Sequence, residues 1–238
     1  MTQKQREIAE KISRVQAEIA QAAVKSGRDP SEITLIGATK VQSGETIRDA
    51  IAAGLTVCGE NRVQELQGHL EEDAYKGAAL HFIGHLQTNK VKYVVGKVDM
   101  IQSVDSERLL DAIDSQAERL SICQDILIEV NIGREENKGG VIPEDLLGLV
   151  EYAQKLPHIC LRGLMCIPPA SASDAENRGF FAATRQLFID TRNKMGDNKL
   201  NIDCLSMGMS GDFALAIEEG ATMVRVGTAL FGPRPSLR

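Results

Sequence analysis

The sequence predicts an α/β fold, and within that class a (β/α)8 barrel with an extra N-terminal helix. Three observations predict it: short apolar segments alternate with helical ones, the alternation repeats eight times, and 238 residues suit one such barrel. The pattern leaves open a doubly wound open sheet. Against that alternative, no Gly-x-Gly-x-x-Gly follows the first strand, where the chain reads Gly37-Ala38-Thr39-Lys40-Val41.

The N-terminal segment 3–26 carries apolar residues at alternating steps of three and four, at Ile8, Ile12, Val15, Ile19 and Ala22. This spacing predicts an amphipathic helix, and Gly27 can end it. The first strand is predicted over 33–40 because this run of β-favouring residues is entered through Asp29-Pro30-Ser31. It ends on Lys40.

The other units follow in the same order. Strands are predicted at 55–58, 80–84, 99–104, 126–131, 160–166, 204–206 and 223–226. Helices are predicted at 43–53, 62–72, 89–95, 106–119, 143–156, 175–195 and 213–219, and a final segment begins at Leu230. Pro143 suits the first turn of its helix. No linker interrupts the pattern, so we expect one domain over 1–238 with the barrel at about 33–233.

Composition narrows the class of protein. The net charge of −6 offers no basic face to nucleic acid, and 43% hydrophobic residues are enough for a sizeable core. The five cysteines form no CxxC pair and most lie in apolar runs, which predicts neither a disulfide framework nor a zinc site and suits a reducing compartment. Residues 1–26 lack the apolar core of a signal peptide, and no apolar run approaches a membrane span, so we expect a cytoplasmic protein.

In a parallel barrel the carboxyl ends of all strands meet at one rim, where active sites lie. The candidate residues at these ends are Lys40, Asn61, His85, Ser103, Asn131, Met165, Ser206 to Ser210 and Arg225 to Thr228. Lys40 stands out, because an amine desolvated at a strand end has a lowered pKa and can attack an aldehyde. The alternative is that Lys40 only marks the exit of the strand into solvent.

The seventh and eighth strands lead into glycine- and serine-containing loops. Phosphate sites in these barrels are frequently built from those two loops. Gly208 and Gly211 allow close backbone approach, Ser210 can cap the next helix, and Gly227-Thr228 adds amides and a hydroxyl. Ordinary turn chemistry is the alternative explanation.

Arginine and histidine also occur at the predicted strand ends. Arg225 suits either a salt bridge or an aromatic nitrogen acceptor, because a guanidinium stays charged and only donates. His81 and His85 are four apart, but on a strand with no carboxylate third ligand they make a poor metal pair, and we expect no metal. His69 and His158 are expected on the surface or in loops.

A lysine after strand one combined with phosphate loops after strands seven and eight resembles a pyridoxal phosphate site. The chain is similar to the pyridoxal 5′-phosphate homeostasis proteins, the YggS/PROSC/PipY family. The matching stretches are Ala38–Lys40, Gly59–Glu65, His81–Lys90, Leu164–Pro169, Leu205–Ser210 and Val224–Gly232. They run in family order from about residue 30 to 233.

The resemblance implies a TIM barrel like the N-terminal domain of alanine racemase and pyridoxal 5′-phosphate as cofactor. Lys40 would hold it as a Schiff base, Arg225 would face the pyridine nitrogen, and Ser210, Gly227 and Thr228 would bind its phosphate. Met209 would also belong to the cofactor site. Asn61 and His85 would line the pocket. The chain departs from the family pattern at Thr39, where serine is expected, and at Arg62, where an aromatic residue is expected.

The resemblance also implies a role in vitamin B6 and amino-acid balance without strong catalysis, with free amino acids and PLP-dependent apoenzymes as candidate partners. A racemase of this class needs a tyrosine base from an added β-domain, for which we expect no room, and the tyrosines at 75, 93 and 152 fall in predicted helices. Arg225 would weaken the cofactor as an electron sink. The alternatives are an amino-acid racemase and a cofactor-free Schiff-base lyase or aldolase. No dimer face is evident, so we expect a monomer.

Overall fold

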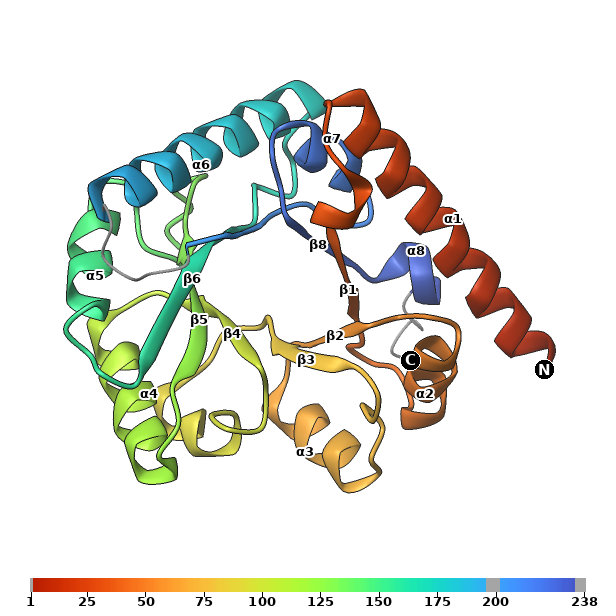
Figure 1. The fold of residues 1–238 in the computed structure, drawn as a ribbon, viewed down its shortest axis with the longest axis horizontal. Coiled ribbons are helices and arrows are strands. Elements are labelled where there is room, and N and C mark those ends of the chain that lie inside the picture. Colours follow the sequence, from red (N-terminus) through yellow and green to blue (C-terminus); the bar gives the residue numbers. More distant parts are fainter. Residues whose placement is uncertain (1, 196–201, 234–238) are drawn as a thin grey trace.

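The structure, a computed structural model, describes residues 2–195 and 202–233. Eight parallel strands form a closed barrel, in which each strand pairs with the next and the last pairs with the first (Figure 1). The connecting helices lie outside the ring of strands. The predicted (β/α)8 fold with an extra N-terminal helix is therefore confirmed.

The strands are β1 (Thr34–Ala38), β2 (Val57–Glu60), β3 (Ala79–Phe82), β4 (Met100–Val104), β5 (Gln124–Val130), β6 (Ile159–Cys166), β7 (Cys204–Ser206) and β8 (Met223–Val226). The helices are α1 (Gln3–Lys25), α2 (Gly44–Ala52), α3 (Val63–Glu71), α4 (Glu107–Leu120), α5 (Leu146–Ala153), α6 (Asp174–Met195), α7 (Phe213–Glu218) and α8 (Thr228–Phe231). Two short 3-10 helices, η1 (Pro30–Glu32) and η2 (Thr88–Tyr93), complete the described elements.

Two helix predictions were wrong in detail. The segment predicted as a helix at 89–95 is the 3-10 helix η2, whose amide of Lys90 bonds the carbonyl of Gln87 three residues back. The helix predicted from Pro143 begins at Leu146. Residues 143–145 form a turn, because the amide of Asp145 bonds the carbonyl of Ile142 at 3.0 Å rather than continuing an α-helical ladder.

Apolar side chains form two layers. Alternate residues of the strands point into the barrel, and those that fill its interior are Ile36, Val57, Met100, Leu127, Met165, Cys204 and Met223. The residues between them point outward and pack against the helices. The helix α1 buries the predicted stripe of apolar residues, together with Ala23, against α2, α7 and α8.

A buried chain of polar side chains crosses the barrel interior above the apolar layer. The side-chain amide of Gln102 donates to His81 Nδ1 at 2.9 Å, and its oxygen accepts from the hydroxyl of Ser206 at 2.7 Å. Each of these three residues is at most 6% exposed. Burial lowers the pKa of His81 to about 4, with Asp99 opposing the shift. His81 is therefore a neutral hydrogen-bond acceptor in the native barrel.

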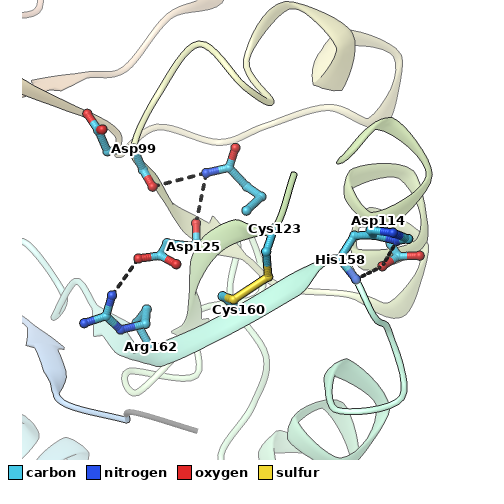
Figure 2. The surroundings of a disulfide bond; sticks show 8 residues. Asp99, Asp114, Cys123, Asp125, His158, Cys160 and Arg162 are labelled. Carbon is cyan, nitrogen blue, oxygen red and sulfur yellow. Dashed lines mark hydrogen bonds and ion pairs between the residues drawn. A yellow bond between two sulfur atoms is a disulfide. The ribbon is translucent and has the colours of Figure 1, made fainter. Parts of the chain in front are cut away.

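The expectation that the cysteines form no disulfide was wrong. Cys123 and Cys160 form a disulfide with their Cα atoms 6.0 Å apart (Figure 2). Cys123 lies just before β5, and β5 pairs with β6 so that Asp125 lies opposite Cys160. The two cysteines are 37 positions apart in sequence, so only this strand pairing brings them together. The absence of disulfides had supported a reducing compartment, and that support is lost.

Cys58, Cys166 and Cys204 are free and buried, as expected for cysteines that behave as small hydrophobic residues. Figure 2 shows the disulfide between two polar pairs, Asp125 with Arg162 and Asp114 with His158. In the part of the chain that the structure describes, no helix has the length and apolar character needed to cross a bilayer.

We predict that the disulfide stabilises the barrel. Replacing Cys123 and Cys160 by serine should lower the free energy of unfolding by about 2–4 kcal/mol, because the bond restricts the unfolded chain. Urea unfolding with and without dithiothreitol measures this. The reductant should shift the midpoint of the wild type and leave that of the double variant unchanged. A wild-type midpoint that does not respond to reductant would contradict the prediction.

We also predict that His81 contributes acid sensitivity. Its pKa is lowered in the folded state from 6.5 to about 4, so the unfolded chain binds more protons between these values and stability falls as pH falls. The loss should approach about 3 kcal/mol near pH 4. Urea midpoints measured across this range should depend less on pH in His81→Gln, which does not titrate. Parallel curves for the two proteins would refute the assignment.

Candidate functional site

Lys40 follows β1 in a tight turn at the rim of the barrel. The amide of Gln42 bonds the carbonyl of Thr39 at 3.0 Å, so Lys40 and Val41 occupy the two central positions of the turn. Lys40 is half-buried and lines a cavity of about 300 Å³. This volume lies at the lower end of the range for small-molecule sites, roughly 300–1,000 Å³.

The cavity brings together residues of β1 and β8 and residues that follow β1, β2, β3, β6, β7 and β8. Seven of the eight residues predicted from the sequence line it: Lys40, Asn61, Met209, Ser210, Arg225, Gly227 and Thr228. The rest of the lining comes from small and apolar residues such as Ala38, Ile83 and Ile167. Lysine and arginine are its only charged side chains among the described residues, so the cavity suits an anion.

Arg225 forms the buried cationic end of the cavity and is 4% exposed. Its guanidinium donates to Ser206 Oγ at 2.6 Å and to the carbonyl of Cys166 at 2.8 Å. Burial lowers the pKa of Arg225, opposed by the charges of Cys166, Glu129 and Asp212, and a guanidinium keeps its proton in proteins regardless. Ser206 is itself hydrogen-bonded to Gln102 in the polar chain, so the residues of the barrel interior fix the position of the Arg225 guanidinium.

Ser210 links the two glycine-containing loops. Its Oγ accepts hydrogen bonds from the amides of Gly227 at 3.1 Å and Ala229 at 3.3 Å. Since the oxygen accepts both bonds, the hydroxyl proton is available to donate elsewhere. The loop is shaped by Gly208, whose φ of +91° places a hypothetical Cβ 2.9 Å from Phe213 Cα. A side chain at Gly208 would therefore move the loop.

Asn61 supplies an unsatisfied acceptor. Its Oδ1 is buried and has no hydrogen-bond partner among the described residues, which is costly unless a ligand donates to it. Glu60 holds the backbone here, since its Oε1 accepts from the amide of Asn61 at 2.6 Å. The backbone of Asn61 also lies close to Gly84, where no side chain fits, because a Cβ there would lie 2.1 Å from the carbonyl oxygen of Asn61.

His85, the eighth predicted residue, is exposed and is not among the residues that line the cavity. A Cβ built on Gly139 would lie 3.7 Å from its Nδ1 and 3.9 Å from Glu129 Oε2, so His85 lies towards β5. Burial raises the pKa of Glu129, while Arg225 opposes the shift.

Other strand-end candidates have structural contacts. The hydroxyl of Ser103 donates to the carbonyl of Gly84, Asn131 exchanges two hydrogen bonds with the backbone of Glu135, and Met165 belongs to the interior apolar layer. His81 is inside the barrel, whereas His85 is exposed at the rim. Over residues 2–195 and 202–233, no three His, Cys, Asp or Glu side chains are grouped as a metal site.

A polar network behind the rim was missed in the sequence. Glu60 is fully buried, and its Oε2 accepts from Tyr75 OH at 3.0 Å and from Thr39 Oγ1 at 3.3 Å. Its Oε2 also lies 3.4 Å from Nδ1 of His69, and the side chain of His69 is only 12% exposed. The expectation that His69 lies on the surface or in a loop was wrong, because it packs on α3 facing the lysine turn. The signal available in the sequence for this network was Glu60, a charged residue at the end of a buried strand.

The chain is similar to several known proteins. The family model described as alanine racemase, N-terminal domain, matches residues 37–235. A pyridoxal phosphate homeostasis protein of Aquifex aeolicus is 46% identical over 94% of this chain and 97% of its own. The protein of the same name from Pseudomonas aeruginosa is 40% identical over 95% of this chain and 96% of its own.

Solved structures show the same fold. PipY of Synechococcus elongatus, with PLP bound, has a TM-score of 0.82 and 33% identity, and the match covers 94% of this chain and 100% of PipY. Alanine racemase of Corynebacterium glutamicum has a TM-score of 0.73, but at 15% identity and 63% coverage of its chain it shows the fold alone. On the evidence of these matches over nearly its whole length, the chain belongs to the family of pyridoxal phosphate homeostasis proteins.

Proposed function

We propose that this protein binds pyridoxal 5′-phosphate in the rim cavity, attached covalently through Lys40, and acts in vitamin B6 homeostasis as a carrier without strong catalysis. The observation that carries the proposal is that Lys40, Arg225 and Ser210 line one cavity of about 300 Å³. When bound, the cofactor supplies an aldehyde carbon that condenses with a primary amine and releases one water.

The phosphate end of the ligand fits the loops after β7 and β8. Ser210 Oγ is held by two backbone amides, so its proton is free for an anionic oxygen, and the hydroxyl of Thr228 lines the same cavity. Hydrogen bonds from neutral donors to an anion are strong. The two cationic side chains of the lining are opposite in charge to a phosphate.

Arg225 supports a carrier over a catalyst. Two of its five N–H groups are used by Ser206 and Cys166, and the guanidinium accepts no proton. A ring nitrogen that faces it therefore accepts a hydrogen bond and stays unprotonated. An unprotonated pyridine withdraws electrons less strongly, and electron withdrawal is what this cofactor contributes to amino-acid chemistry.

The racemase alternative requires a second proton-transfer group. Among the described lining residues, Lys40 and Arg225 are the only ones that ionise, and an arginine is a poor base. Tyr75 donates to Glu60, Tyr152 donates to Asp111, and Tyr93 lies beside Lys90 and Lys92; the described lining includes none of them. The lining thus supports holding the ligand over racemisation.

The relatives add support at the level of the family. The curated relatives are named for pyridoxal phosphate homeostasis, and the related PipY has been solved with PLP bound. We extend both to this chain and propose a cytoplasmic monomer, as predicted from the sequence. Free amino acids and PLP-dependent apoenzymes are the partners that a carrier of this cofactor would meet.

We predict that Lys40 is the attachment point. Incubation with pyridoxal phosphate should give a visible absorption band, and borohydride reduction followed by peptide mapping should place the label on Lys40, because this amine lines the cavity with the anion-binding loops. The peptide that contains residue 40 should carry no label in Lys40→Ala. Lys76→Ala, which changes an exposed lysine, should label like the wild type. Wild-type label mainly on another lysine would contradict the assignment.

The same experiment separates the alternatives. Wild-type protein that stays colourless and unlabelled after incubation with pyridoxal phosphate would favour a cofactor-free lyase or aldolase. Interconversion of L- and D-alanine by the labelled protein would favour a racemase.

We predict that Ser210 binds the phosphate. Ser210→Asp places a carboxylate against the anion, so the affinity for pyridoxal phosphate should fall by about 10-fold or more. Pyridoxal, which lacks the phosphate, should bind the variant and the wild type with similar affinity. Titration followed by the visible band measures both. An equal loss of affinity for the two ligands would show that Ser210→Asp disturbs the site generally. It would contradict a contact between Ser210 and the phosphate.

A further inference from the structure

Two side chains of α3 bind backbone groups of the lysine turn. Glu65 Oε2 accepts from the amide of Val41 at 2.8 Å, and His69 Nε2 lies 3.0 Å from the carbonyl oxygen of Gln42. A carbonyl only accepts, so this ring nitrogen carries the proton. Glu65 and His69 are four positions apart and therefore share one face of α3. Together they hold the segment that directly follows Lys40.

The turn that they hold is strained. Val41 has a φ of +62° at the third position of the turn closed by Gln42 and Thr39. Turns with a positive φ at this position favour Gly or Asn, and a β-branched residue there is an outlier that costs on the order of 1–3 kcal/mol. Such a conformation persists only where the surroundings impose it. Here Glu65 binds the amide of the strained residue itself.

The residue before Lys40 is held by the same network. Thr39 Oγ1 bonds the carbonyl of Gly59 at 3.1 Å and Glu60 Oε2 at 3.3 Å. Glu60 accepts from Tyr75, whose oxygen lies 3.0 Å from Nδ1 of His69. Both neighbours of Lys40 in sequence are therefore tied to β2 and α3, and the backbone that carries the amine has little freedom.

Arg62 extends this arrangement to the position where the chain departs from the family pattern. Its guanidinium lies 3.5 Å from Glu65 Oε1, the carboxylate oxygen that does not bind Val41. The side chain of Arg62 is 73% exposed, so the pair adds little stability by itself. It does bias Glu65 towards the orientation in which Oε2 meets the amide of Val41.

We propose that Glu65 and His69 are positioning residues that clamp the strained turn and so direct Lys40 into the cavity. The inference rests on the proposed cofactor site and adds to it a control on the lysine from outside the cavity. Neither residue lines the cavity among the described residues, so each acts through the backbone of the turn. An amine that is held in a productive geometry reacts faster with an aldehyde. Loss of the clamp would therefore slow the attachment of the cofactor to Lys40.

The test compares Glu65→Ala, which removes the acceptor, with Glu65→Gln, which retains an oxygen in place. The rate of attachment of pyridoxal phosphate to Lys40, followed by the visible band and by mapping after reduction, should fall about 10-fold in Glu65→Ala and stay near the wild-type rate in Glu65→Gln. Glu71→Ala changes an exposed glutamate at the end of the same helix and should match the wild type. Thermal midpoints show whether all variants are folded.

Hydrogen exchange of the Val41 amide tests the clamp without the cofactor. Exchange should be slow in the wild type and Glu65→Gln and about 10-fold faster in Glu65→Ala. Equal attachment rates in Glu65→Ala and the wild type would overturn the proposal, as would a loss in Glu65→Gln as large as in Glu65→Ala. If the wild type attaches the cofactor at another lysine, the proposed cofactor site fails, and unchanged Val41 exchange in Glu65→Ala would overturn the clamp separately.

Discussion

The pairing of β1 with β8 is the constraint on which the candidate site depends. The register sets Ile36 beside Arg225 and Gly37 beside Val226. Continued towards the rim, it brings the lysine turn beside the loop that starts at Gly227. In an open sheet the first and last strands would be separated, whereas closure makes them neighbours. A single small molecule can therefore contact the amine of the first strand and the hydroxyls and amides of the last loops.

The polar chain inside the barrel gives Arg225 one position. A buried guanidinium is costly unless its donors are paired, and Ser206 and the carbonyl of Cys166 pair two of them. Ser206 in turn donates to Gln102, which donates to His81, so the chain reaches across to β3. These hydrogen bonds fix which atoms of Ser206, Gln102 and His81 donate and which accept. The position of the charge that Arg225 brings to the cavity is thus set by residues that do not line the cavity.

The sequence predicted the elements well because hydrophobic periodicity reports local structure. The strands at Cys204–Ser206 and Met223–Val226 lie at the predicted residues, and Lys40 lies at the cavity as a strand-end residue should in a barrel. Pairings between distant segments have no local signal. The Cys123–Cys160 disulfide depends on the β5–β6 register, and the contact of His69 with Gln42 depends on how α3 packs against β2. Both were therefore missed.

Residues outside the cavity lining hold the turn that carries Lys40. Besides Lys40, the only ionisable side chain of the described lining is Arg225, which keeps its proton, so the lining offers no second proton-transfer group. In the proposed carrier, holding and release of the ligand depend on how firmly its anionic end is bound and on how the amine of Lys40 is oriented. The proposal assigns the first to Ser210, whose Oγ two backbone amides hold. It assigns the second to the strained turn that α3 holds in place, so a small change at Glu65 would alter retention without any change in the cavity wall.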